Sequence, residues 1–175
     1  MADGIVGILL AAGRGSRFGS DKLLHRLPDG RPLALAAAQS LRGACPRVVA
    51  IVRPEQPTLA TLLAAAGCEL VLCPQAELGM GHSLAAGVQA TPEALGWLVA
   101  LADMPFITAA SHQAVRAQLQ AGARLAATEY AGRRGHPVGF ARPWLGQLAA
   151  LSGDQGARDI LHSHRQSLVR CPVDD

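Results

Sequence analysis

A glycine-rich segment near the N-terminus holds the residues whose types and spacing best suit chemistry. Its sequence is Leu10-Ala11-Ala12-Gly13-Arg14-Gly15-Ser16-Arg17-Phe18-Gly19, followed after one residue by Asp21-Lys22. Glycines let the backbone turn sharply and present N–H groups to an anion. Arg14, Arg17 and Lys22 add positive charge to the same short stretch. The segment therefore predicts a binding site for a triphosphate.

Lys22 is the single lysine among the sixteen Lys and Arg residues of the chain, and it falls inside this segment. An ammonium group is a compact point charge of the kind that proteins use to hold phosphate. A bias of the composition toward arginine would explain the scarcity of lysine equally well. The position of Lys22 therefore adds modest support to the triphosphate site.

Two other phosphate-binding loops fit this segment less well. A Rossmann dinucleotide loop also follows a first strand, but Ser-Arg-Phe-Gly after Gly13-x-Gly15 breaks its G-x-G-x-x-G pattern. The second expected strand ends in Val52-Arg53, with no acidic residue for a ribose. A Walker loop requires Gly-Lys-Ser or Gly-Lys-Thr, and neither occurs in the sequence. A tight turn without a ligand is the remaining alternative.

Two aspartates have positions that suit a divalent cation. Asp103 follows the apolar run 97–102, where a carboxylate is costly unless it is paired or binds a metal. Its hard oxygens suit Mg²⁺, which keeps several waters and bridges phosphates. Asp154 lies in Gly153-Asp154-x-Gly156, before an expected helix. The alternative for each aspartate is the N-cap of a helix.

The elements that must position these residues alternate between strand and helix. Apolar runs predict strands at 4–11, 47–52, 68–73, 97–102, 125–130 and 138–140, with a last strand at 167–171. Helices are expected at 32–41, 58–66, 108–120, 144–151 and 157–164. Residues 79–83 are expected as a loop that leads into a helix ending near 90, and residues 132–135 as a basic turn.

This alternation predicts an α/β fold with a mostly parallel sheet that is covered by helices on both faces. In such sheets, ligands bind beyond the C-terminal ends of the strands. Segments 11–22 and 79–83 and Asp103 all lie at expected strand ends or in the loops beyond them. We therefore expect these three parts of the chain to form one site.

The composition bounds the class of protein. Half of the 175 residues are apolar, which is enough for the core of a single domain spanning 1–175. No apolar run approaches the ~20 residues of a membrane helix, and the N-terminus lacks the pattern of a secretion signal, so we expect a cytoplasmic protein. The net charge of +3, without a run of basic residues, disfavours nucleic acid as a partner. The four cysteines lack metal-site spacing and are expected as free thiols.

The motifs and their order resemble the MobA-like nucleotidyltransferases, and within them the molybdenum cofactor cytidylyltransferases. Leu-Ala-Ala-Gly-x-Gly-x-Arg-Phe-Gly-x-x-Lys-Leu is similar to the family signature. It is followed by Gly79-Met80-Gly81-His82-Ser83-Leu84, Leu101-Ala102-Asp103-Met104-Pro105, Arg134-Gly135-His136-Pro137 and Gly153-Asp154-Gln155-Gly156-Ala157-Arg158. The resemblance covers nearly the whole chain.

The resemblance implies a Rossmann-like three-layer sandwich of the nucleotide-diphospho-sugar transferase type, with a mostly parallel mixed sheet and one antiparallel strand. It also implies transfer of CMP from CTP to the terminal phosphate of a molybdenum-molybdopterin cofactor, with Mg²⁺ bound and pyrophosphate released. The attacking phosphate is already ionised, so the reaction requires no general base. A molybdoenzyme is a possible partner that receives the product.

The resemblance also implies roles for particular residues. Arg17, Lys22 and Asp103 are expected to be catalytic, and Asp103 and Asp154 to hold the metal. His136 is expected to contact the pterin or its phosphate, with an exposed histidine in a turn as the alternative. Ser83 is expected to contact the base region, with an ordinary N-cap as the alternative. The nucleotide is expected to contact Leu10, Ala11, Ala12, Gly13, Gly15 and Ser83.

Three alternative functions stay open at the level of the sequence. A guanylyltransferase that uses GTP has the same fold, but that branch typically reads Leu-Ala-Gly-Gly where this chain has Ala12. The methyl group of Ala12 takes room from a base and should disfavour the larger purine. A non-catalytic chaperone for the molybdenum cofactor is disfavoured by the intact Lys22 and Asp103. A nicotinamide-dependent oxidoreductase is the weakest of the three.

Overall fold

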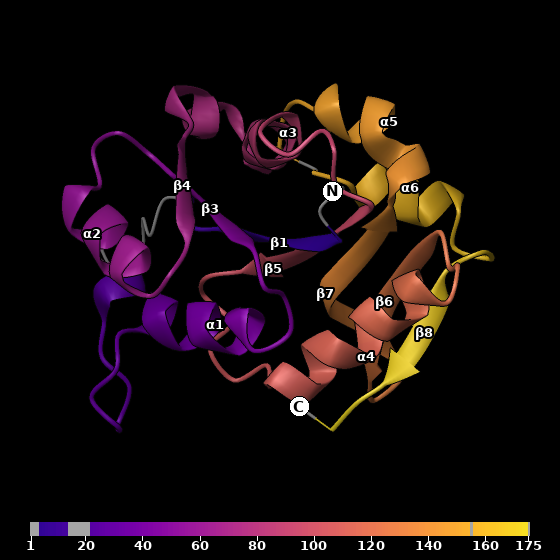
Figure 1. The fold of residues 1–175 in the computed structure, drawn as a ribbon, viewed down its shortest axis with the longest axis horizontal. Coiled ribbons are helices and arrows are strands. Elements are labelled where there is room, and N and C mark those ends of the chain that lie inside the picture. The colour runs from indigo at the N-terminus through magenta and orange to yellow at the C-terminus, as the bar shows by residue number, and fades with distance from the viewer. Residues whose placement is uncertain (1–3, 14–21, 155, 175) are drawn as a thin grey trace.

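The centre of the protein is a mixed sheet, seen in a computed structural model that describes residues 4–13, 22–154 and 156–174 (Figure 1). Among these residues β7 is antiparallel to both of its neighbours, and every other adjacent pair of strands is parallel. This confirms the mostly parallel sheet with one antiparallel strand. Side by side, the strands are β4 (Glu69–Leu72), β3 (Val48–Val52), β1 (Ile5–Leu10), β5 (Gly96–Leu101), β7 (Arg133–Ala141), β6 (Leu125–Tyr130) and β8 (Val169–Pro172).

Helices cover both faces of the sheet and complete the expected three-layer α/β architecture (Figure 1). One face carries α1 (Leu33–Arg42), α2 (Pro57–Ala65) and α4 (Ala109–Gln120). The other carries α3 (Met80–Gln89), α5 (Leu145–Ala149) and α6 (Arg158–Ser163). No helix among the described residues is both long and apolar enough to cross a bilayer.

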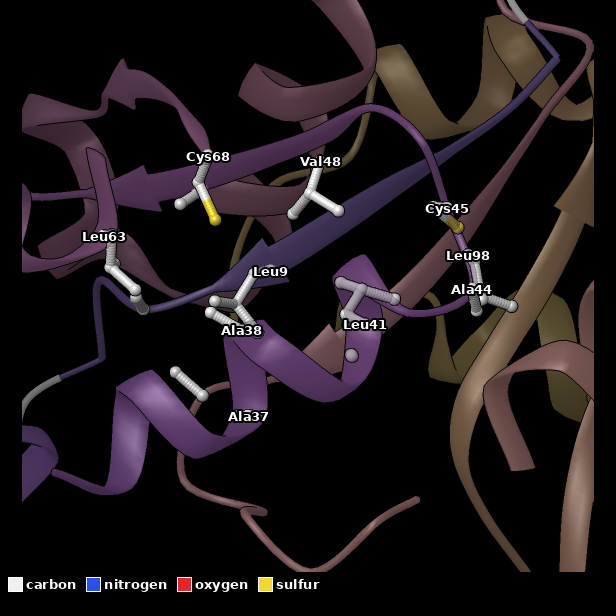
Figure 2. Close-up of a cluster of buried hydrophobic side chains, with 14 of the residues drawn as sticks. Leu9, Ala37, Ala38, Leu41, Ala44, Cys45, Val48, Leu63, Cys68 and Leu98 are labelled. Carbon is white, nitrogen blue, oxygen red and sulfur yellow. The ribbon is translucent and has the colours of Figure 1, made fainter. Parts of the chain in front are cut away.

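The apolar run of β1 is continuous because both faces of this central strand are buried. Ile5 and Leu9 belong to the hydrophobic cluster on the side of α1, α2 and α4, whereas Val6, Ile8 and Leu10 belong to the cluster on the side of α3, α5 and α6. Figure 2 shows part of the first cluster, in which Ala38 of α1 lies beside Leu9. The four cysteines are free and buried, as expected.

The order of the strands reverses between β1 and β5. From β1 the chain moves outward through β3 to β4, and α3 then returns it to β5 on the other side of β1. β1 and β5 pair in register up to Leu10 and Leu101, and the N–H of Ala102 donates to the carbonyl of Leu10 at 3.1 Å. Loops that leave such a switch point diverge and leave a crevice at the C-terminal ends of the strands.

Two local expectations are wrong. Residues 79–83 do not form a loop, because α3 begins at Met80 directly after Gly79, whose φ of 127° favours glycine. Residues 132–135 are not a turn either, because the turn between β6 and β7 consists of Ala131 and Gly132, with φ values of 53° and 79°. Two successive positive φ values match the tight hairpin turn that suits twisted strands, so β7 starts at once, at Arg133.

Candidate active site

A cavity of about 440 Å³ opens at the C-terminal ends of β1 and β5, at the switch point of the sheet. We call it the first cavity. Leu10 and Leu101 end the two strands, and Ala12 and Asp103 each follow two residues later. The remaining lining residues are Gly13, Lys22, Leu23, Gln56, Ala76, Glu77, Gly79, Met80, Ser83 and Asp154.

The side chains of Lys22 and Asp103 form an ion pair in this cavity. The Lys22 Nζ atom lies 3.6 Å from Asp103 Oδ2, and both side chains are partly exposed, at 39% and 43%. An exposed pair of this kind contributes only about 0.2–1 kcal/mol, so it is easily exchanged for stronger partners. The ammonium of Lys22 therefore lies beside the carboxylate at which a cation was expected.

The N-terminus of α3 is held in the first cavity by a contact with a segment about 70 residues further along the chain. The N–H of Gly81 donates to the carbonyl of Gly153 at 2.8 Å, and the N–H of Gly153 donates to His82 Nδ1 at 3.2 Å. A Cβ atom on Gly81 would lie 2.6 Å from the carbonyl oxygen of Ser152, and one on Gly79 would clash with Gly153. Glycine is therefore required at both positions, and the contact brings Asp154 to the cavity wall.

A second cavity, of about 920 Å³, shares Asp103 with the first. One side of it comes from the residues that follow Asp103, which are Met104, Pro105, Phe106 and Ile107. The hairpin formed by β6 and β7 lines the other side, from Thr128 and Tyr130 to Arg133, Arg134 and His136. Asp103 is thus the residue at which the two cavities adjoin.

His136 lines the second cavity, and its surroundings disfavour the charged form of its imidazole. Burial, and to a smaller extent the positive charge of Arg134, lower the pKa of the His136 imidazole to about 4, against a smaller opposing effect of Asp103. His136 is therefore neutral at pH 7. It lies within β7 and is partly buried, so the alternative of an exposed turn histidine is wrong.

The N-cap alternatives for three residues are also wrong. Thr108 caps α4, since its Oγ1 accepts a hydrogen bond from the N–H of Ser111 at 3.2 Å, so Asp103 has no such role. The N-cap position of α6 is Ala157 and not Asp154. The N-cap position of α3 is Gly79, which leaves Ser83 in the second half of the first turn, buried and lining the first cavity.

Most of the residues singled out in the sequence meet at the two cavities. Leu10, Ala12, Gly13, Lys22, Ser83, Asp103 and Asp154 line the first, and His136 lines the second. The exception is Ala11, whose side chain is buried in the cluster beneath α1 and α2 and lines neither cavity. Gly15 and Arg17 lie outside the described residues.

Sequence reasoning missed several residues of the lining. In the first cavity these include Gln56 and Glu77, which follow β3 and β4. In the second cavity they include Phe106, Tyr130 and Arg133. The available signal was their position. Gln56, Glu77 and Phe106 come after strands, Tyr130 ends β6 and Arg133 starts β7, all near the edge of the sheet where ligands bind.

Known proteins resemble this chain over nearly its whole length. The family described as MobA-like NTP transferase domain matches residues 7–168. "Purine catabolism protein PucB" of Bacillus subtilis (strain 168) is 29% identical over 168 residues, which cover 91% of this chain and 81% of that protein. "Nicotine blue oxidoreductase" of Paenarthrobacter nicotinovorans is 30% identical over 168 residues, which cover 90% of this chain and 81% of that protein.

A solved structure extends the similarity to three dimensions. Rv0371c from Mycobacterium tuberculosis H37Rv, in complex with manganese, aligns with a TM-score of 0.82 at 25% identity. The alignment covers 100% of this chain and 90% of the other.

The contact between Gly81 and the 152–154 segment predicts a strong effect of one methyl group. We expect Gly81→Ala to destabilise the protein by about 1–3 kcal/mol, because its Cβ would meet backbone atoms that cannot move aside easily. For a chain of this length the melting temperature should fall by roughly 2–12 °C. Differential scanning calorimetry of the purified variant measures this.

Gly146→Ala is the matched control, because a Cβ on this glycine of α5 meets no atom within 4 Å. It should leave the melting temperature unchanged or raise it slightly. Equal melting temperatures for Gly81→Ala and Gly146→Ala would contradict the close contact.

Proposed function

Because the chain belongs to the MobA-like NTP transferase family, we propose that it transfers CMP from CTP to the terminal phosphate of a molybdenum-molybdopterin cofactor and releases pyrophosphate. One observation carries the proposal: two cavities adjoin at a single carboxylate, Asp103, beside which lies the only lysine of the chain. A transferase needs this arrangement, since the attacking group of the acceptor must lie next to the atom of the donor that it attacks.

The nucleotide is assigned to the first cavity. Its volume is within the range of roughly 300–1,000 Å³ that small-molecule sites occupy. The N-terminus of α3 lies in its wall, and the positive end of a helix dipole favours the phosphates. Leu10, Ala12, Gly13 and Ser83 are the described residues proposed to contact the nucleotide, with Ala11 and Gly15 adding backbone groups.

A divalent cation fits the acidic groups of the same cavity. Mg²⁺ is usually held by one or two carboxylates together with the phosphates of a substrate. Asp103 and Asp154 line the first cavity and provide two such carboxylates. We assign the ion to them, and manganese in the related Rv0371c structure supports a divalent metal. Bound there, Mg²⁺ would supply positive charge to the α- and β-phosphate oxygens.

In the proposed reaction, the residues of the chain bind and orient the reacting groups. An oxygen of the acceptor phosphate forms a bond to the α-phosphorus of CTP, while the bond from that phosphorus to the α–β bridging oxygen breaks. The electron pair leaves with pyrophosphate, which Lys22 and Arg17 hold by charge. The acceptor phosphate is already ionised, so no residue has to remove a proton. The neutral His136 is proposed to face the acceptor.

The runner-up is GTP as the nucleotide, with the same acceptor and the same residues. A chaperone that only binds the cofactor would have no use for the pair of Lys22 and Asp103. An oxidoreductase is favoured only by the name of one relative, and Arg53 follows β3 where a nicotinamide dinucleotide fold has an acidic residue for the ribose. Titration with NADH would detect such binding directly.

Asp103→Asn should nearly abolish turnover. The carboxamide keeps the shape of the side chain but loses the charge that holds the cation, and Asp103 is exposed enough for the fold to stay intact. The measurement is pyrophosphate release with CTP, Mg²⁺ and the molybdopterin cofactor, together with a thermal melt. Near-wild-type turnover would rule out the assignment of Asp103.

Lys22→Met should change the affinities for nucleotide and metal in opposite directions. Without Lys22, CTP loses a charged hydrogen bond worth roughly 1.5–3 kcal/mol. Mn²⁺ alone should bind more tightly, by up to about 5-fold, because Asp103 is no longer paired with the ammonium. Calorimetry with CTP and electron paramagnetic resonance with Mn²⁺ measure the two affinities.

Arg26→Met removes a positive charge four residues further on, from a side chain that donates to the carbonyl of Gly30. Neither affinity should change in this control. Weaker binding of both ligands to Lys22→Met, or equal effects at the two positions, would mean that Lys22 does not alternate between Asp103 and phosphate.

Ala12→Gly should narrow the preference for CTP over GTP. Ala12 is 2% exposed and lines the first cavity, so its methyl group limits how closely a base approaches the backbone. A change of this size supplies at most ~1–3 kcal/mol of discrimination, so the preference should shrink and not invert. The ratio of kcat/KM for the two nucleotides decides this, and a wild-type enzyme that prefers GTP would favour the runner-up.

A further inference from the structure

The second cavity contains an unusual share of the aromatic side chains. The chain has only two Trp, one Tyr and three Phe residues. Of the five that the structure describes, Trp97, Phe140 and Trp144 are buried. The other two, Phe106 and Tyr130, are 73% and 56% exposed, and both line this cavity. Exposed aromatic faces in a hollow favour stacking with a planar ring.

The same cavity also carries positive charge. Arg133 and Arg134 line it, and Asp103 is the only acidic residue among the described residues of its lining. Arg134 also lies near Arg158 and Arg170, and burial together with these two charges lowers the pKa of its guanidinium. Arg170 is paired with Glu129 at 3.0 Å, whereas Arg134 has no ion pair with any acidic group in the described part of the chain. An anionic group of a ligand would offset this crowding of positive charge.

Hydroxyl groups are few among the described residues that line this cavity. They belong to Thr128 and Tyr130, and the Thr128 Oγ1 already donates to the carbonyl of His136 at 2.9 Å. The exposed aromatic rings of the cavity can stack on a planar ring, and its arginines can bind an anion. The cavity therefore suits a flat ring that carries an anionic group.

We propose that Phe106 and Tyr130 hold the planar heterocyclic ring of the acceptor, a pterin, and that Arg134 binds its phosphate and directs it toward Asp103. The inference rests on the proposed function, because it assigns the acceptor to the cavity that adjoins the nucleotide site. Phe106 comes from the segment after β5, Tyr130 from the end of β6 and Arg134 from β7.

The test uses the full chain and fluorescent pterins without any turnover. Neopterin monophosphate, neopterin and ribose 5-phosphate are titrated against the wild type. Neopterin monophosphate should bind most tightly, neopterin more weakly, and ribose 5-phosphate weakest. Phe106→Leu and Tyr130→Leu should each raise the Kd of both pterins by roughly 2- to 10-fold. Arg134→Gln should raise only the Kd of neopterin monophosphate, by about 10-fold or more, and leave the Kd of neopterin unchanged.

Two control variants remove similar groups elsewhere on the surface. Leu95→Ala truncates an exposed apolar side chain at the opposite end of β5, and Arg165→Gln removes an exposed guanidinium that donates to the carbonyl of His162. Neither should alter pterin binding. Ribose 5-phosphate that binds as tightly as neopterin monophosphate, or unchanged Kd values in the aromatic variants, would overturn the inference.

Two further arms separate this inference from the proposed function. CTP with Mn²⁺ should bind the Phe106, Tyr130 and Arg134 variants as it binds the wild type. If CTP binds and releases pyrophosphate onto another phosphate acceptor while no pterin binds, the inference fails and nucleotidyl transfer stands. If GMP replaces the pterin with equal affinity and the same three variants weaken it, the assignment of a pterin fails.

Discussion

The parallel pairing of β1 with β5 is the constraint on which both cavities depend. These strands come from opposite sides of the reversal in strand order, and they end together because Leu10 pairs with Leu101. Both strands are buried apart from the partly buried Leu101, and a slip by one residue would turn each side chain to the opposite cluster. The segments with Ala12 and Asp103 therefore leave the sheet side by side.

Several charged side chains of the two cavities lie near Asp103, at the end of this pair of strands. Asp103 lines both cavities, the Lys22 Nζ atom lies 3.6 Å from its Oδ2 atom, and Arg133 and Arg134 line the second cavity. A single carboxylate between a lysine and a group of arginines suits a reaction between two phosphates, because their mutual repulsion must be offset from both sides.

The sequence predicted the sheet and its layers well, because a strand buried on both faces leaves a continuous apolar run, as in 5–10 and 96–101. It also predicted that Lys22, Ser83 and Asp103 share a site, since each lies at a strand end or in a loop beyond one, and the family resemblance added Asp154. The prediction failed where the start of an element depends on a few backbone angles. The start of α3 depends on the φ of Gly79, and the start of β7 depends on the hairpin turn at Ala131 and Gly132.

The second cavity was harder to predict, because periodicity does not reveal which aromatic side chains stay exposed. Phe106 follows the apolar strand β5, and Tyr130 is the last residue of β6. From the sequence alone, both would be assigned to the core. The partial burial of His136 likewise depends on β7 lying between β5 and β6, a long-range arrangement that adjacent residues do not encode.

The contact of Gly81 with Gly153 has a consequence for the order in which the protein is synthesised. A nascent chain can pair β1, β3, β4 and β5 and pack α3 before residue 110 has left the ribosome exit tunnel. The wall of the first cavity at Asp154, and the carbonyl to which Gly81 donates, do not yet exist at that stage. The half of the chain that carries the glycine-rich segment therefore acquires a complete pocket only late in translation, when the residues after α5 emerge.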